Sequence, residues 1–416
     1  MFAILSSNKW LVHSLDIKSA FLQGLPIDRE IFIKPPSQAM TDMLWLLLQC
    51  PYGLSDASRQ WYLKVRQELL RLGFVQLKLD NAVFMWYHNG CLHGLVACHV
   101  DDFVYGGSDL FHSTVVTSLR KVFIVGKEQS RCFKFLGIFV ECLDDRIRLS
   151  MQPYTNSLQE MDTSILSKEK STALTVTEST SLKQLSGQIN WLATQCRPDI
   201  AYENCILGNS LSSATVRDVI FANKTVRKVK NHCSDLLFHC DVNLNDCAVV
   251  SFCDASFGNL PNGGSQGAYI TLLMDNTGLY VPIAWQSRRV RRVVKSTVAA
   301  ECLAAIEAAE NVVLISTALK SILSNQKCCI KCLIYCDNKN LVNAVYSSTK
   351  VEDQRLQIDI CVLRGMIDNG ELSKFCWVPT KLQIANCLTK QGASVYDMLN
   401  ILNKKLRFNF SDGTFM

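Results

Sequence analysis

The sequence contains little proline or glycine and no long apolar run. Of its 416 residues, 20 are glycine and 9 are proline, too few for a collagen-like or low-complexity chain. No stretch approaches the ~18 consecutive apolar residues of a membrane-spanning helix. The apolar stretch at the start of the chain is too short for a secretory signal. We therefore expect an intracellular protein that does not enter a membrane.

The excess of one sign of charge over the other is also small. The 43 Lys and Arg residues outnumber the 37 Asp and Glu residues by only six. This surplus is compatible with a nucleic-acid partner but does not establish one. Because 48% of the residues are hydrophobic and 19% are charged, the chain can bury a large core, which excludes wholesale disorder. At ~150 residues per domain, its length predicts about two or three domains.

Cysteine is the abundant exception, with 19 residues. The odd number and the long chain argue against a disulfide framework. Most cysteines lie in apolar strings, such as residues 95–100, where reduced thiols pack as small hydrophobes. Cys329 and Cys332, with Cys328 adjacent, form one CxxC pair. A zinc site needs a second pair, for which only the His-Cys dipeptides at 232–233 and 239–240 are candidates, so it is the less favoured alternative.

Three blocks can be separated along the chain, at residues 1–145, 146–244 and 245–405. The first mixes apolar strands with an aromatic-rich helix, and its run at 43–48 predicts a buried strand. The second is mostly helical, and its Ser/Thr-rich stretch at 171–181 favours a mobile connection.

The third block has the clearest order of elements. The apolar runs and the turn signals between them predict three consecutive strands, a long helix at 296–323, a further strand, helical stretches and a last strand. Ser296 or Thr297 is the expected N-cap of the long helix. The strands are expected at 247–253, 267–274, 279–285, 329–336 and 375–379. This pattern is typical of an α/β layer architecture.

Carboxylates end two apolar runs of the first block. Asp16 closes one run, and the adjacent Asp101 and Asp102 follow another. Two neighbouring carboxylates after a buried strand are costly unless their charge is compensated. Compensation can come from solvent at a hairpin turn, which spacing alone favours. It can also come from divalent metal ions of the kind that catalyse phosphoryl transfer.

The third block contains a similar set of polar residues. Asp254 closes its first strand, Glu301 lies one turn into the long helix, and Asp337 closes the next strand. Asn386 lies in the final helical stretch. Individually these are ordinary turn and cap residues, and they could converge only through the fold.

Thirteen short strings of residues, each different and spread along the chain, carry a resemblance to a known family. They are VHSLDIKSAFLQG (12–24), PYGL (51–54), RQWY (59–62), HVDD (99–102), FLGI (135–138), LSG (185–187), RPDIAY (197–202), DAS (254–256), ST (296–297), AE (300–301), YCDN (335–338), QIA (383–385) and LTK (388–390). In these strings the chain resembles the C-terminal part of the Pol polyprotein of copia-type LTR retrotransposons.

The resemblance implies a mixed α/β (α+β) fold in three parts. They are a reverse-transcriptase palm-like domain lacking most of the fingers, a helical thumb or connection segment, and an RNase H-like mixed-sheet domain. It also implies two phosphoryl-transfer sites, each with two Mg²⁺ ions. Asp16, Asp101 and Asp102 would serve an RNA-directed DNA polymerase. Asp254, Glu301 and Asp337 would serve a ribonuclease H.

The resemblance further implies nucleic-acid partners: an RNA–DNA hybrid, a primer-template and deoxynucleotide triphosphates. The densest basic run lies between the third strand and the Glu301 helix of the third block, and comprises Arg288, Arg289, Arg291, Arg292 and Lys295. By position it could contact hybrid phosphates. A solvated loop and a nuclear-import patch are the alternatives.

Three departures from the family pattern stand out. His99 replaces the usual aromatic residue before Val-Asp-Asp, a tolerable change because its ring is also planar. Asn386 replaces the usual Asp and brings no negative charge, so we expect weaker metal binding and slower cleavage. Only 15 residues precede Asp16, which predicts that the fingers are missing and that DNA synthesis is impaired.

These departures leave other functions open. An RNase H-only nuclease is one alternative, and a non-catalytic nucleic-acid-binding remnant or domesticated protein is another. The expected location is cytoplasmic, in particles, or nuclear.

Overall fold

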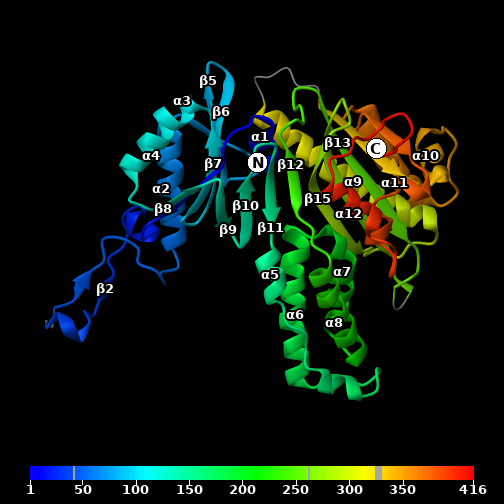
Figure 1. Cartoon of the computed structure of the whole chain (residues 1–416), viewed down its shortest axis with the longest axis horizontal. Coiled ribbons are helices and arrows are strands. Elements are labelled where there is room, and N and C mark those ends of the chain that lie inside the picture. The colour runs from blue at the N-terminus through cyan, green and yellow to red at the C-terminus, as the bar shows by residue number, and fades with distance from the viewer. Residues whose placement is uncertain (41–42, 261–262, 324–329) are drawn as a thin grey trace. The chain divides into compact units, whose positions relative to one another are not determined.

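The computed structural model describes residues 1–40, 43–260, 263–323 and 330–416. The chain divides into two compact units (Figure 1). Unit 1 comprises Met1–Phe135 with Ser321–Gln326, and unit 2 comprises Leu136–Lys320 with Lys327–Met416. The domain boundaries expected at residues 145 and 244 stay a prediction.

Unit 1 is built on a six-stranded antiparallel sheet of order β4-β5-β6-β7-β1-β8. The strands of this sheet are β1 (His13–Ile17), β4 (Phe74–Gln76), β5 (Val83–His88), β6 (Cys91–His99), β7 (Asp102–Gly107) and β8 (Val125–Ser130). Unit 1 also contains β9 (Cys132–Phe135), which is not part of this sheet, and the helices α1 (Phe2–Ser7), α2 (Ala57–Arg71), α3 (Asp109–Phe111) and α4 (Thr117–Val122). Helix α2 buries Trp61, Val65 and Leu69 against the sheet. Their spacing of four residues places them on one helix face.

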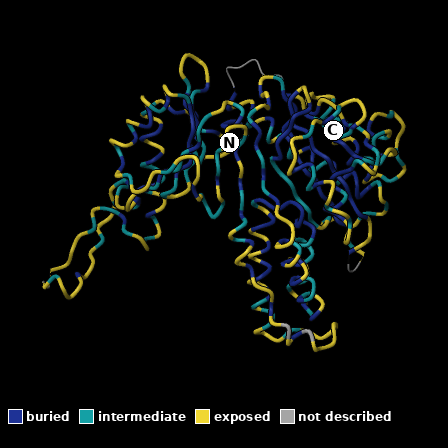
Figure 2. The backbone as a smooth tube through the Cα atoms, viewed as in Figure 1, coloured by how far each residue is buried: buried dark blue, intermediate teal, exposed yellow. Residues whose placement is uncertain are grey.

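A small hairpin of unit 1 contradicts the buried strand expected at 43–48. Strands β2 (Phe32–Ile33) and β3 (Trp45–Leu46) pair only with each other. Trp45 is 45% exposed and Leu48 70% exposed, and Figure 2 shows mostly exposed residues among the described part of the hairpin. The prediction of burial was wrong because a two-stranded ribbon has no second layer to cover its apolar side chains.

The first part of unit 2 combines an antiparallel sheet with helices. Strands β10 (Ile138–Cys142) and β11 (Arg146–Ser150) pair with each other, and β11 pairs with β12 (Leu236–His239). The helices are α5 (Gln152–Ser157), α6 (Val176–Gln195), α7 (Ala201–Ser210) and α8 (Val216–Asn231). The mobile connection expected at 171–181 is wrong in its second half, because Thr175 and Glu178 form a capping box that begins α6.

The second part of unit 2 is a five-stranded mixed sheet of order β15-β14-β13-β16-β17. Strands β13, β14 and β15 are antiparallel, whereas β16 and β17 run parallel to β13. The bounds are β13 (Cys247–Ser256), β14 (Gln266–Asp275), β15 (Tyr280–Arg289), β16 (Lys331–Cys336), β17 (Lys374–Trp377), α9 (Thr297–Ile322), α10 (Lys339–Tyr346), α11 (Gln354–Asp368) and α12 (Tyr396–Asn403). The predicted order of elements is confirmed, and with it the mixed α/β fold class.

Both faces of this mixed sheet are covered. Ala300 and Ala304 of α9 pack against Ala255 on one face. Met398 and Ile401 of α12 belong to the core cluster on Val250 and Phe252. This double cover explains why β13 and β14 are buried along their whole length and have near-continuous apolar sequences.

The cysteines of the described residues are free thiols. Cys332 is buried, and Cys328 and Cys329 of the considered zinc pair lie outside the described residues. Among the helices that the structure describes, none has the length and apolar character needed to cross a membrane.

Candidate metal-binding sites

The three acids of the first block meet at the end of two neighbouring strands. Asp16 on β1 lies directly opposite Asp102 on β7 in the antiparallel register. Asp101 occupies the turn between β6 and β7, where the amide of Ile17 donates a hydrogen bond to its carbonyl oxygen at 2.9 Å. The sheet therefore brings Asp16 beside Asp101 and Asp102, which follow it by 85 and 86 positions in the sequence.

The turn that presents these acids is held from behind. Val100 has a φ of +57°, a conformation that is rare for a β-branched residue. The indole nitrogen of Trp61 donates to the Val100 carbonyl oxygen at 2.5 Å. This bond ties the turn to the buried face of α2 and stabilises the uncommon backbone conformation.

No basic side chain of the described residues pairs with this group of acids. Burial, followed by the negative charges of Asp101 and Asp16, raises the pKa of Asp102 above its ordinary value. Among the described residues, no lysine or arginine forms an ion pair with the three carboxylates. Oxygen ligands with excess negative charge are the donor set that Mg²⁺ prefers, so these residues fit that ion.

Gly126 on β8 creates the space for the Asp16 side chain. Strands β1 and β8 are neighbours, and a Cβ atom added to Gly126 would collide with the Asp16 carboxylate oxygen Oδ2. The absence of a side chain at this position therefore sets where the carboxylate can lie.

The acids of the third block form a second group at the carboxyl end of the mixed sheet. Asp254 lies near the end of β13, and Asp337 follows the neighbouring parallel strand β16. Glu301 lies in the second turn of α9, which Ser296 caps by accepting a hydrogen bond from the Ala299 amide at 3.2 Å. Ligand atoms of Glu301, Asp337 and Cys336 all lie within 4.8 Å of one another.

Asp254 is 1% exposed and has two partners from the segment after β17. The hydroxyl of Thr389 donates a hydrogen bond to its Oδ2, and the Lys390 ammonium lies 3.5 Å from the same oxygen. Lys390 also donates to the Asn386 amide oxygen at 2.6 Å. The Asn386 amide nitrogen in turn donates to the Thr380 carbonyl oxygen at 3.0 Å. One lysine therefore connects the site carboxylate to the unusual asparagine.

Burial dominates the titration of this second group. It raises the pKa of Asp254 to about 6, against the opposing effect of the Lys390 charge. It also raises the pKa of Glu301 to about 10, with Cys336, Asp254 and Asp337 adding to the rise. A bound divalent cation would reverse these shifts because it stabilises the ionised carboxylates. The donor set of three acids therefore fits Mg²⁺.

The basic run lies partly in a strand, and several of its residues are paired with acids. Arg288 and Arg289 belong to strand β15 and not to the following loop, and Arg288 Nε donates to Glu307 at 2.7 Å. Arg292 pairs with Asp359, and the Lys295 ammonium is 4.0 Å from Asp353. Arg289 and Arg291, both exposed, form no ion pair among the described residues.

Sequence reasoning missed several residues that shape the two groups of acids. Cys336 and Lys390 lie within recognised strings, but nothing in those strings indicated contact with Glu301 or Asp254. Gln383 donates to the carbonyl oxygen of Cys253 at 2.9 Å and so ties its segment to the end of β13. Gly126 lies outside the strings, and no signal in a single sequence would have found it.

Two solved structures are similar to this chain at low identity. A foamy viral protease-reverse transcriptase in complex with an RNA/DNA hybrid has a TM-score of 0.49 and 11% identity, covering 89% of this chain and 44% of its own. LC11-RNase H1 in complex with an RNA/DNA hybrid has a TM-score of 0.26 and 14% identity, covering 32% and 88%.

Curated relatives extend over most of the chain. The retrovirus-related Pol polyprotein from transposon RE1 of Arabidopsis thaliana is 26% identical over 403 residues, which cover 92% of this chain and 26% of that protein. The Pol polyprotein from transposon TNT 1-94 of Nicotiana tabacum is 23% identical, covering 91% and 30%. A putative transposon Ty5-1 protein of Saccharomyces cerevisiae is 27% identical, covering 67% and 94%. The chain thus spans about a quarter of the length of the RE1 polyprotein.

Residues 1–173 match the family model described as reverse transcriptase (RNA-dependent DNA polymerase). The Pol relatives span this region and continue through the mixed sheet of unit 2. The chain is thus similar to the reverse transcriptase family over residues 1–173, and over about 92% of its length to Pol polyproteins of transposons.

Proposed function

We propose that this chain acts on RNA–DNA substrates by metal-assisted phosphoryl transfer at two sites, one for RNA-directed DNA synthesis and one for RNA cleavage. The observation that carries the proposal is the direct pairing of Asp16 with Asp102 beside Asp101. The second group, with Asp254, Glu301 and Asp337, has the same character. We assign the polymerase to residues 1–145, the connection to 146–244 and the nuclease to 245–405.

Each group of acids would hold two Mg²⁺ ions. When bound, such ions activate the attacking oxygen and stabilise charge on the leaving group. In the first site, Asp16, Asp101 and Asp102 would supply the oxygen ligands, and Trp61 would keep the Val100 turn in place. The partners would be a primer-template and deoxynucleotide triphosphates.

In the second site, Asp254, Glu301 and Asp337 would supply the ligands. The Thr389 hydroxyl would orient Asp254, and Gln383 would hold the end of β13. Lys390 competes with a metal ion for the charge of Asp254, and Asn386 adds no charge to offset it. We infer slower cleavage than a site with a fourth acid would give.

The basic run would contribute to hybrid binding through two of its residues. The charges of Arg288, Arg292 and Lys295 are offset by neighbouring acids. These acids are Glu307, Asp359 and Asp353, respectively. We propose that Arg289 and Arg291 contact the phosphates, because their charge is available to an external anion.

Two parallel assays on the full chain test the proposal. One follows cleavage of an end-labelled RNA strand in an RNA–DNA hybrid with Mg²⁺, and the other follows primer extension on an RNA template. Asp254→Asn should abolish cleavage and preserve extension, whereas Asp102→Asn should do the reverse. Each variant is thus the control for the other.

The pattern of outcomes separates the functions. Cleavage without extension would replace the proposal with an RNase H-only nuclease. Binding of the hybrid without either reaction would indicate a non-catalytic remnant. Loss of both reactions in either single variant would contradict two independent sites.

A further inference from the structure

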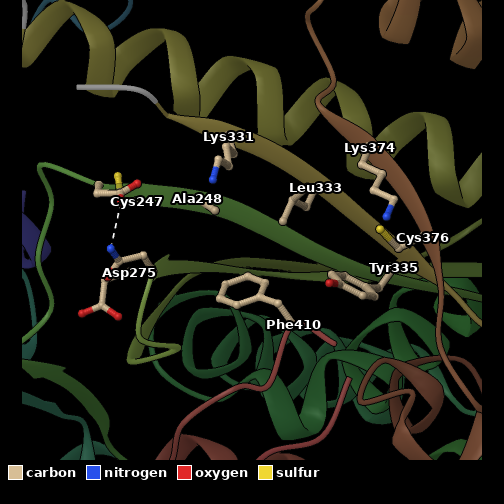
Figure 3. Close-up of a pocket in the computed structure, with 11 residues that line it drawn as sticks. Cys247, Ala248, Asp275, Lys331, Leu333, Tyr335, Lys374, Cys376 and Phe410 are labelled. Atoms are coloured by element: carbon tan, nitrogen blue, oxygen red, sulfur yellow. Dashed lines mark hydrogen bonds between the residues drawn. The ribbon is translucent and has the colours of Figure 1, made fainter. Parts of the chain in front are cut away.

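A pocket of about 340 Å³ lies on the mixed sheet of unit 2 (Figure 3). Its floor includes Ala248 of β13 and Leu333 of β16. Lys331 begins β16 and Asp337 follows its end. Six residues at ~3.3 Å per residue place the two about 20 Å apart. None of Asp254, Glu301 and Asp337 is among the residues that line the pocket, which is therefore a separate site.

Strand alternation gives the pocket its aromatic and basic groups. Lys331, Leu333 and Tyr335 are alternate residues of β16 and share one face. Figure 3 shows Lys331 and Lys374 on either side of Leu333, with the rings of Phe410 and Tyr335 below them. The pocket thus combines two amino groups with two flat rings.

The aromatic rings are fixed by a third ring. Phe408 packs edge-on against Tyr335 with centroids 5.3 Å apart, and against Phe410 with centroids 5.2 Å apart. Phe408 and Tyr335 are buried, whereas Phe410 is 38% exposed. Phe410 is therefore positioned from below while part of its ring stays accessible, as a stacking surface requires.

The acids of the pocket are engaged, but its lysines are not. Asp275 accepts from the amides of Thr277 and Leu279 at 2.9 and 3.1 Å. Asp246 accepts from the Asn276 amide at 2.8 Å. Lys331 and Lys374 form no ion pair among the described residues. The ammonium groups of Lys331 and Lys374 can therefore pair with a ligand anion, although the pocket also contains the two carboxylates.

We propose that this pocket binds one nucleotide unit, with its base on Phe410 and its phosphate between Lys331 and Lys374. Aromatic stacking tolerates any base because every base has a flat face. Lysine binds phosphate as a point charge. The volume lies in the range of small-ligand sites. A free mononucleotide and the 5′-phosphorylated end of a strand share this chemistry.

The test uses the full chain in EDTA, so that metal-dependent binding at the acids cannot contribute. The probe is AMP, titrated by calorimetry beside adenosine and inorganic phosphate. We expect saturable binding of AMP and at least about tenfold weaker binding of the two fragments, because each makes only half of the contacts. Equal binding of phosphate and AMP, or no binding of AMP, would overturn the proposal.

Variants locate the binding. Lys331→Ala, Lys374→Ala and Phe410→Ala should each weaken AMP binding by about fivefold or more. Lys350→Ala removes an exposed lysine elsewhere in the same unit and should leave binding unchanged. An equal loss of AMP binding in the Lys350 variant would mean that binding depends only on the overall positive charge, and it would refute the site.

A measurement on the unaltered protein is independent of how the variants fold. AMP should protect Lys331 and Lys374 from amine acylation, read by mass spectrometry, while Lys350 stays reactive. Unchanged reactivity at saturating AMP would contradict the site. A 5′-phosphorylated dinucleotide that protects as well as AMP would identify strand ends as the source, and protection by AMP alone would identify free nucleotides.

Discussion

The buried ion pair of Arg197 and Asp199 should dominate the stability of the helical part of unit 2. The two side chains are 2% and 0% exposed, and Arg197 Nε lies 2.8 Å from Asp199 Oδ1. Arg197 Nη2 donates to Oδ2 at 2.8 Å, and Nη1 donates to the Val229 carbonyl oxygen of α8 at 3.1 Å. The pair thus joins the start of α7 to the end of α8.

Arg197→Met keeps the length of the side chain but leaves a buried carboxylate without its partner. Removing one member of a buried pair costs about 3–5 kcal/mol. For a unit of this size, that loss corresponds to a fall in melting temperature of roughly 10 °C. The double variant Arg197→Met with Asp199→Leu should recover most of the loss, because no charge remains buried.

Hydrogen exchange of peptides from α6 to α8, read by mass spectrometry in the full chain, reports this unit separately from the other. Arg227→Met is the matched control, because Arg227 of α8 forms an exposed ion pair at 3.0 Å with Glu160. Its loss should cost less than about 1 kcal/mol. Equal exchange in the two single variants, or a double variant as unstable as Arg197→Met, would refute the reasoning.

Three further predictions concern the acids and the sheet of unit 1. Gly126→Ala should displace the Asp16 carboxylate and so reduce primer extension about tenfold or more, with an unchanged melting temperature. An equal loss of hybrid cleavage in this variant would contradict the prediction. Asn386→Asp should raise hybrid cleavage, on the order of tenfold, because the new carboxylate draws Lys390 from Asp254; an unchanged rate would count against this account. Burial, followed by the charge of the neighbouring His112, lowers the pKa of His13 from its ordinary 6.5 to about 4. The unfolded chain therefore takes up this proton first, and stability should fall as pH falls from about 6.5 to about 4. The melting temperature of His13→Asn should fall less across this pH range than that of the unaltered protein. An equal fall in both proteins would contradict the role of His13.

The sequence by itself determined the order of elements and the identity of the acids. The strands of the mixed sheet and the helix α9 followed from apolar periodicity, turn residues and the Ser296 cap, because these signals are local. Asp16, Asp102 and Asp254 were found because acids at the ends of apolar runs are costly and therefore informative.

Only the tertiary structure decided what surrounds those acids. Lys390 reaches Asp254 across 136 residues, and Gly126 opens the space for Asp16 from a neighbouring strand. Arg288 and Arg292 lost their availability because acids from α9 and α11 pair with them. The run at 43–48 was misread for the same physical reason. A local pattern encodes which residues prefer burial or charge, whereas the fold decides whether a second layer or a counter-charge meets them.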